Sequence, residues 1–182
     1  MKILLNFRKL IGLYSLKRKL RLLNRKRNVH NFDTAKKAGL IFACAGEEDF
    51  ESIKNFKKYL EEKNIKTSAI GFIDDKQIPD HLLLRKGFNF FSLKNLDWYF
   101  RPKSQFINDF TNEKFDILFD LSLKYYFPVH YIVTLSPAEY KIGRYCNTED
   151  YDLMIETGKN KQITFLLDQI KHYVNMIHRS QP

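Results

Sequence analysis

Glu47 and Asp120 carry the carboxylates of this sequence that are best placed for acid–base chemistry, and Ser122 follows Asp120 two positions later. Each follows a short apolar run that predicts a buried strand. In an open α/β sheet the ligand crevice lies beyond the carboxyl ends of the strands, so we expect these three residues to line such a crevice. Two carboxylates can transfer protons, but acids at a helix start or a strand end usually serve the fold. The sequence therefore assigns no catalytic residue and favours a protein that is not an enzyme.

The segment that follows the first predicted strand has no nucleotide-binding motif. Residues 44–49 read CAGEED, with one glycine and three acids, and match neither GxGxxG nor GxxxxGK[ST]. Acidic side chains at the start of a helix would repel a phosphate, so we expect no NAD, no ATP and no other cofactor. The five histidines are scattered and neither HExxH nor CxxC occurs, so we expect no metal site.

The strongest signal is the distribution of charge. The first 32 residues contain ten basic residues and no acidic one. The whole chain of 182 residues has 31 Lys and Arg against 21 Asp and Glu, so its net charge of +10 lies entirely in this segment. Cations this close repel each other, and a bound polyanion would relieve the repulsion and release counterions. The side chains expected to bind it are Arg8, Lys9, Lys17, Arg18, Lys19, Arg21, Arg25, Lys26 and Arg27.

We expect the polyanion to be a nucleic acid, with RNA or a ribonucleoprotein preferred. No base-reading motif accompanies the cations, so the contacts should be to phosphates. The leading hypothesis is therefore a non-enzymatic nucleic-acid-binding protein that uses a basic N-terminal helix on an α/β scaffold. The alternative is a peripheral protein of the membrane surface, because anionic lipids attract the same cations. A third alternative needs no partner: the basic helix is solvated and docks on its own domain through its leucines.

Residues 2–27 contain one glycine and no proline, which predicts a helix. In its first half one side is apolar, through Ile3, Leu4, Phe7, Leu10, Ile11 and Tyr14. In its second half roughly the opposite side is apolar, through Leu13, Leu16, Leu20 and Leu23. A straight helix lying on a membrane should present one continuous apolar face. We therefore expect a bend near Gly12, or different partners for the two halves.

From residue 38 onward, short apolar runs alternate with amphipathic segments. This pattern predicts strands over 38–44, 67–73, 88–91, 115–121, 139–145 and 151–156, and helices over 47–63, 104–112, 126–135 and 161–177. Such alternation is typical of βαβ units with a mostly parallel sheet covered on both faces. Right-handed crossovers then give a Rossmann-like three-layer α/β sandwich. We expect a basic helical leader, residues 1–32, and a single Rossmann-like domain, residues 33–182.

The cysteine content and the hydropathy indicate the compartment. The chain has two cysteines far apart, which suits a reducing cytosol. It shows no secretory signal and no apolar run of about 20 residues, so we expect no transmembrane segment. The sequence therefore predicts a cytoplasmic protein.

An aromatic cluster precedes two cations, Arg101 and Lys103. Its rings can stack on bases or fill a core beneath a long loop, and we favour the core. The cluster comprises Phe88, Phe90, Phe91, Trp98, Tyr99 and Phe100.

Two segments resemble the heptosyltransferase family of glycosyltransferases. Residues 115–122 read FDILFDLS and residues 135–143 read LSPAEYKIG. In that family the corresponding stretch, within residues 115–143 here, lies in the N-terminal, acceptor-side Rossmann half of a two-domain enzyme. The family's Gly-Asp pair would correspond to Gly46 and Glu47, which departs from the pattern. The resemblance implies the Rossmann-like fold and, as a further alternative, an acceptor-side half-domain that acts with a partner chain.

Over nearly its whole length the chain also resembles a family of short, basic Bacteroidota proteins with a domain of unknown function. The shared features are the basic leader, EEDF at 47–50, the FDILFDLS strand, the Ile-Gly pair at 142–143 and YDLMI at 151–155. This resemblance implies a cytoplasmic protein and carries no active residues.

Overall fold

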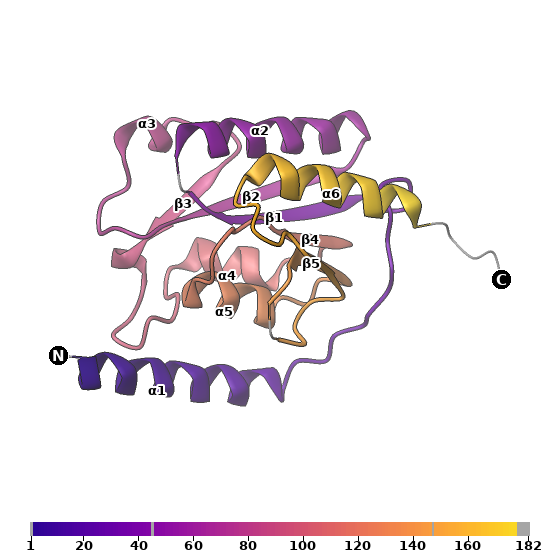
Figure 1. Cartoon of the computed structure of the whole chain (residues 1–182). Coiled ribbons are helices and arrows are strands. Elements are labelled where there is room, and N and C mark those ends of the chain that lie inside the picture. Colours follow the sequence, from indigo (N-terminus) through magenta and orange to yellow (C-terminus); the bar gives the residue numbers. More distant parts are fainter. Residues whose placement is uncertain (1, 45, 147, 178–182) are drawn as a thin grey trace.

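The computed structural model describes residues 2–44, 46–146 and 148–177, with side chains for residues 7, 8 and 10 onward. Six strands form one fully parallel sheet in the order β3-β2-β1-β4-β5-β6 (Figure 1). This is the strand order of a Rossmann fold, and it confirms the predicted fold class. The strands are β1 (Lys37–Ala43), β2 (Lys66–Ile73), β3 (Asn89–Ser92), β4 (Ile117–Asp120), β5 (Tyr140–Arg144) and β6 (Leu153–Ile155).

Helices cover both faces of the sheet. The helices α2 (Glu47–Glu62) and α6 (Ile163–Met176) pack together on one face, and α4 (Gln105–Asn112) and α5 (Phe127–Leu135) pack together on the other (Figure 1). The short helix α3 (Asp80–Leu83) and the 3₁₀ helix η1 (Leu93–Asn95) lie in the connections around β3. The first helix, α1 (Lys2–Leu20), packs on α5 from outside and adds a fourth layer.

Coverage on both faces explains the unbroken apolar runs of the strands. On β1, Leu40 and Phe42 belong to the core beneath α2 and α6, whereas Ile41 belongs to the core beneath α4 and α5. Each of these side chains is fully buried and contributes about 2 kcal/mol to folding. In the described part of the chain no helix has the length and apolar character that crossing a bilayer requires.

The leader differs from its prediction in one respect. A helix through residue 27 is wrong, because α1 ends at Leu20. Residues 21–36, which we call the strap, run instead to the start of β1, and the Asn28 N–H donates to the Glu139 carbonyl at 3.2 Å. These contacts with distant residues outweigh helix propensity, which is a weak local preference. At the end of the strap Phe32 enters the core beneath α2, so the leader is packed onto the domain.

The two apolar sides of the leader have different surroundings, as one of the alternatives expected. Leu16 packs against Phe127 and Tyr131 of α5. Gly12 faces the same way, and a Cβ there would lie 2.6 Å from the Tyr99 carbonyl oxygen and 3.0 Å from the Phe127 ring. Only glycine allows this approach, and the helix continues through it.

We predict that Gly12→Leu detaches α1 from α5. The new side chain would meet backbone that cannot move aside, and overpacking of this kind costs about 1–3 kcal/mol. Hydrogen exchange should show amides of residues 2–20 exchanging roughly tenfold faster, while amides of β1 and β4 keep their protection. Tyr14→Leu, on the exposed side of the same helix, is the matched control and should leave exchange unchanged. Equal protection in both variants would contradict this docking.

Candidate functional site

The nine cations expected to bind a polyanion fall into distinct groups. Arg25 is a structural residue: its side chain is 9% exposed, it pairs with Asp152, and its Nε donates to the Ala138 carbonyl at 2.5 Å. Arg27 Nε lies 3.7 Å from the other carboxylate oxygen of Asp152, but its side chain is 66% exposed. Asp152 also accepts the Lys141 backbone N–H at 2.7 Å. Arg25 therefore ties the strap to β5 and the start of β6.

Two further cations attach α1 to the domain. The Arg8 guanidinium lies over the rings of Trp98 and Phe100, at 4.8 and 4.4 Å from their centroids, and its Nε donates to the Trp98 carbonyl at 2.5 Å. Lys19 Nζ lies 5.6 Å from the centre of the Tyr131 ring. The Lys9 side chain lies outside the described residues. Contacts of this kind hold the helix in place and leave part of each cation accessible.

The remaining predicted cations lie at the surface. Within residues 2–44, 46–146 and 148–177, none of them forms an ion pair; of the leader's Lys and Arg residues, Arg25 and Arg27 pair with Asp152, and His30 lies 2.9 Å from Glu139. The charge excess seen in the sequence therefore persists in the fold. The remaining exposed cations are Lys17, Arg18, Arg21 and Lys26, and Lys19 is exposed as well.

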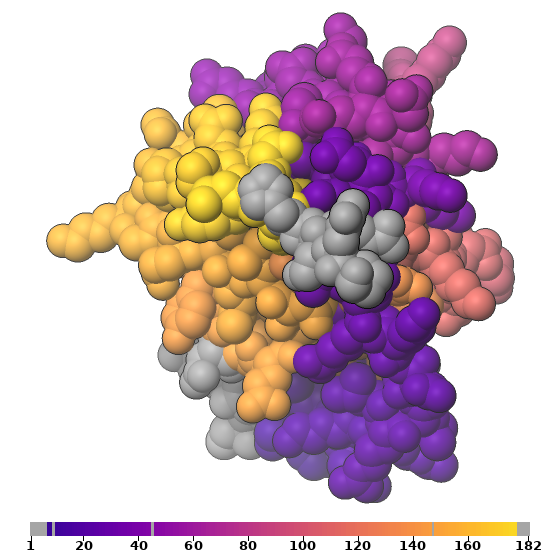
Figure 2. Space-filling model, turned by 90° about the vertical axis from the view of Figure 1, so that its right-hand side faces the viewer, coloured from indigo at the N-terminus to yellow at the C-terminus, as the bar shows by residue number. Residues whose placement is uncertain are grey.

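An apolar stripe faces away from the domain on α1. Phe7, Leu10 and Tyr14 are 55, 63 and 72% exposed, and their spacing places them on one side of the helix, opposite Gly12 and Leu16. We call Phe7, Leu10 and Tyr14 the outer stripe. The space-filling view shows the leader as a bulge on the lower side of the molecule (Figure 2). Large exposed apolar side chains grouped in this way mark an interaction surface.

The structure brings together only two of the three residues predicted to line a crevice. Asp120 is buried, accepts the Tyr151 hydroxyl at 2.6 Å and the Ser122 N–H at 2.9 Å, and the Ser122 hydroxyl accepts the Ala43 N–H at 3.2 Å. Burial raises the pKa of the Asp120 carboxyl, against the opposing effect of these hydrogen bonds. Glu47 instead pairs with Arg85, which lies just after α3. No carboxylate pair for proton transfer is formed by Glu47 and Asp120.

A second polar group lies next to Asp120, around His130 and Cys146. His130 Nε2 is 3.4 Å from the Asp150 carboxylate, and burial lowers the pKa of its imidazole. Asp120, His130 and Cys146 border a small cavity of about 20 Å³. Burial, and next the charge of Asp120, raise the pKa of the Cys146 thiol. A nucleophilic cysteine needs a lowered pKa, so this arrangement does not activate the thiol.

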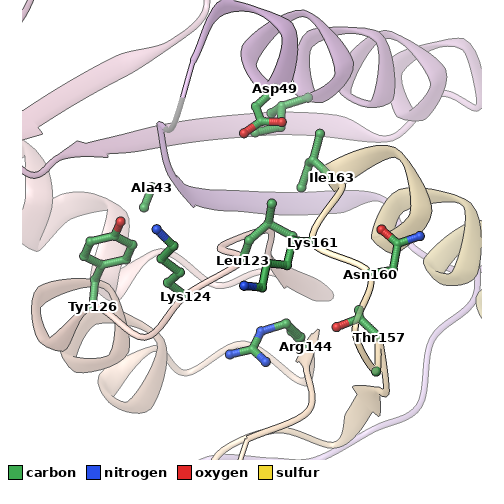
Figure 3. A pocket seen from close by; sticks show the side chains of 12 residues that line it. Ala43, Asp49, Leu123, Lys124, Tyr126, Arg144, Thr157, Asn160, Lys161 and Ile163 are labelled. Atoms are coloured by element: carbon green, nitrogen blue, oxygen red, sulfur yellow. The ribbon is translucent and has the colours of Figure 1, made fainter.

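A cavity of about 460 Å³ lies beyond the carboxyl ends of β1, β4, β5 and β6. Three cations, Lys124, Arg144 and Lys161, border it, with Asp49 of α2 on another side (Figure 3). None of these cations was selected from the sequence, although Arg144 lies near the end of the predicted strand 139–145 and Lys124 follows the predicted strand 115–121. In the described part of the chain, no three His, Cys, Asp or Glu residues are grouped to hold a metal ion.

The aromatic cluster before Arg101 has two parts, one in the cores of the domain and one in contact with α1. Phe90 and Phe91 are buried in the two cores, as favoured from the sequence. Trp98 is half exposed beside Arg8, and Phe100 adopts a left-handed backbone conformation with φ +64° beneath the same guanidinium. Trp98 therefore supports α1, and Phe100 packs both beside Leu16 and against the core beneath α4 and α5.

Comparison with protein families gives one match, over residues 8–177, to a family described as a family of unknown function (DUF6913). Comparison with curated proteins and with solved structures gives no match. The family match covers both the leader and the sheet.

A buried lysine adjoins the Arg25–Asp152 pair. Lys141 on β5 is enclosed, and its Nζ donates to the Thr134 carbonyl at 3.1 Å. Burial, and next the charge of Arg25, lower the pKa of Lys141 to about 7. In the unfolded chain the pKa of a lysine is about 10.4, so between these values the unfolded state binds one more proton. Stability contributed by neutral Lys141 is therefore present above pH 10 and is lost as the pH falls to 7.

We predict that Lys141→Met removes this pH dependence. Between pH 7 and 9 the free energy of unfolding should rise in the wild type but not in the variant. The difference, variant minus wild type, should therefore fall by roughly 1 kcal/mol per pH unit. Urea denaturation at pH 6, 7.5 and 9 measures the difference. Lys36→Met, at an exposed position, should show a constant difference. Parallel curves for Lys141→Met and wild type would show that Lys141 stays charged in the fold.

Proposed function

We propose that this chain, which belongs to a family of unknown function (DUF6913), binds the surface of anionic membranes through α1. The observation that carries this proposal is the outer stripe: Phe7, Leu10 and Tyr14 point away from the domain, next to exposed cations. An interfacial helix lies in the membrane plane with its apolar side among the acyl chains and its cations near the headgroups.

The position of the cations suits such a surface. At about 100° per residue, Lys17 and Arg18 lie within about 60° of the outer stripe, one on each side of it. Arg21 follows at the end of the helix and is exposed. Each cation near an anionic surface contributes about 1 kcal/mol. Apolar burial and charge attraction therefore act on the same side of one helix.

The docking of α1 answers the sequence argument against a membrane. Two apolar sides on one helix do not fit a helix that meets only lipid. In the structure the side of Leu16 is already buried on α5, which leaves the outer stripe as one uninterrupted apolar face. A helix with two apolar sides is what a protein needs when it must hold both its own domain and a bilayer.

RNA or a ribonucleoprotein is the second candidate partner. The exposed rings of Phe7 and Tyr14 beside Lys17 and Arg18 could stack on single-stranded bases while the cations bind phosphates. Leu10 offers no stacking surface, and for this reason we rank RNA below the membrane. A cytoplasmic location, with Cys44 and Cys146 as free thiols, suits either partner and is part of the proposal.

An acceptor-side glycosyltransferase half-domain remains a prediction from the resemblance of residues 115–143. It would need Glu47 or Asp120 to meet a substrate. Both are engaged within the protein, Glu47 with Arg85 and Asp120 with Tyr151. We therefore rank it third.

The experiment is co-sedimentation of the full chain with vesicles. We predict binding to vesicles of phosphatidylcholine with 30% phosphatidylglycerol, about the anionic content of a moderately charged membrane, and little binding to phosphatidylcholine alone. Lys17→Gln/Arg18→Gln/Arg21→Gln should weaken binding about a hundredfold, from three cations at about 1 kcal/mol each. Leu10→Ser should weaken it about tenfold by removing apolar burial.

Matched controls separate the surface from net charge. Lys86→Gln/Lys94→Gln/Lys114→Gln removes the same charge from exposed positions elsewhere and should leave binding within about twofold. Equal weakening in this control, or equal binding to neutral vesicles, would refute the proposal. Binding to poly(U), unchanged by Leu10→Ser and without any vesicle binding, would replace the membrane with RNA.

A further inference from the structure

The 460 Å³ cavity beyond the carboxyl ends of the strands lies where Rossmann-like sheets bind ligands. The connections after β1 and β4 leave towards opposite sides of the sheet, because β2 lies beyond β1 and β5 beyond β4. A crevice opens between such connections. Ala43 at the end of β1, Leu123 after β4 and Arg144 at the end of β5 all border the cavity. Its volume of about 460 Å³ is in the range of small-molecule sites.

The charge of this cavity is positive and unbalanced. Lys124, Arg144 and Lys161 border it with Asp49 as the only acid, which gives a local charge of +2. Among the described residues, no carboxylate forms an ion pair with any of these three cations. The Arg144 Nε is buried and has no hydrogen-bond partner within the described residues. Because this atom is closed off from solvent, a ligand in the cavity would meet the positive charge of Arg144 rather than its Nε–H.

The start of α6 adds polar groups on the same side. Thr157 and Asn160 border the cavity immediately before the helix, and Ile163, its first residue, borders it as well. Gln162 at the helix start makes no side-chain capping bond, so the first N–H groups of this 14-residue helix keep their donors for another acceptor. Together with Arg144 and the lysines, these N–H groups favour an anion.

Repulsion of a phosphate by acidic residues is expected at the start of α2, and not at the start of α6. Three acids begin α2, and they would repel a phosphate at its N-terminus. In the fold Glu47 turns to Arg85, and Asp49 alone borders the cavity. Burial, and next Glu48, raise the pKa of the Asp49 carboxyl. An anion therefore belongs on the side of β5 and α6, with hydroxyl groups towards Asp49.

We infer that this cavity binds a small phosphate monoester of a polyol, with its phosphate at Arg144, Lys161 and Lys124. A phosphate monoester carries a charge of about −1.5 to −2 at neutral pH, which matches the local charge of +2. Its hydroxyl groups reach Asp49 and Asn160, and Leu123, Ile53 and Ile163 cover the carbon skeleton. Figure 3 shows the cationic side chains and Asp49 bordering the same opening. This site is separate from the outer stripe and does not depend on the membrane proposal.

Calorimetric titration of the full chain with ribose 5-phosphate tests the inference. We expect saturable binding with a Kd of about 1 mM or tighter, and no binding of ribose. Lys124→Ala/Lys161→Ala removes two exposed cations of the cavity and should weaken binding about tenfold or more. Circular dichroism would show that this variant keeps its fold, because both lysines are exposed.

Two controls make the outcome decisive. Lys159→Ala lies in the same loop but does not border the cavity, and it should leave the affinity unchanged. Lys17→Gln/Arg18→Gln/Arg21→Gln, on α1, should also leave it unchanged. Loss of affinity in either control equal to that of the cavity variant would overturn the site, since phosphate would then respond to overall charge. Absence of saturable binding for both ribose 5-phosphate and inorganic phosphate would overturn it as well.

Discussion

The close approach of α1 to α5 at Gly12 determines how the N-terminal segment is presented. A side chain at this position would collide with the Tyr99 carbonyl and the Phe127 ring, so the helix can dock only with its Gly12 side inward. Leu16 lies one turn further along and is buried by the same contact. The rotation of the helix is thereby fixed, and with it the outward direction of Phe7, Leu10 and Tyr14. Arg25 then anchors the strap through Asp152, so the helix is held at both its middle and its exit.

The same logic of local charge explains the two candidate binding regions. Beyond the leader, acids and bases balance over residues 33–182. Several ion pairs there link residues three or four positions apart on the surface, as Lys54 does with Glu51, and contribute little. Lys17 and Arg18 differ because their segment contains no acidic residue, and Lys124, Arg144 and Lys161 differ because they gather around one cavity with a single acid. Cations concentrated in this way attract anions.

Most of the sheet could be predicted from the sequence because its signals are local. The run FDILFDLS and the apolar residues of 38–44 predict buried strands without reference to any other segment; β4 lies within the first, and β1 overlaps the second except for one residue at each end. The strap could not be predicted, because Arg25 meets residues more than 110 positions away and no local pattern encodes such a contact. The contact of Glu47 could not be predicted either, because its partner Arg85 comes from a loop 38 positions away. Glu47 was therefore assigned to the crevice.

The candidate sites show the same division. The charge of the leader is visible in the sequence, but which of its cations serve the fold is not, since Arg8 and Arg25 look no different from Arg18. Lys124, Arg144 and Lys161 are spread over 38 positions and become a group only when the parallel strands align their carboxyl ends. The rule that ligands lie beyond those ends was available from the sequence, but applied to it the rule selected Glu47, Asp120 and Ser122 and not these cations.

The direct test of this account is the depth of residue 10 in a bilayer. A nitroxide spin label is placed on Leu10→Cys, with Cys44 and Cys146 replaced by serine. Its relaxation by oxygen, which is enriched in the bilayer, and by a water-soluble nickel complex measures whether the label lies in lipid or in water. On anionic vesicles the account predicts a label that oxygen reaches and nickel does not, while a label at Thr164 on α6 stays in water. Vesicle-bound protein whose label at position 10 remains as accessible to nickel as that at position 164 would contradict it.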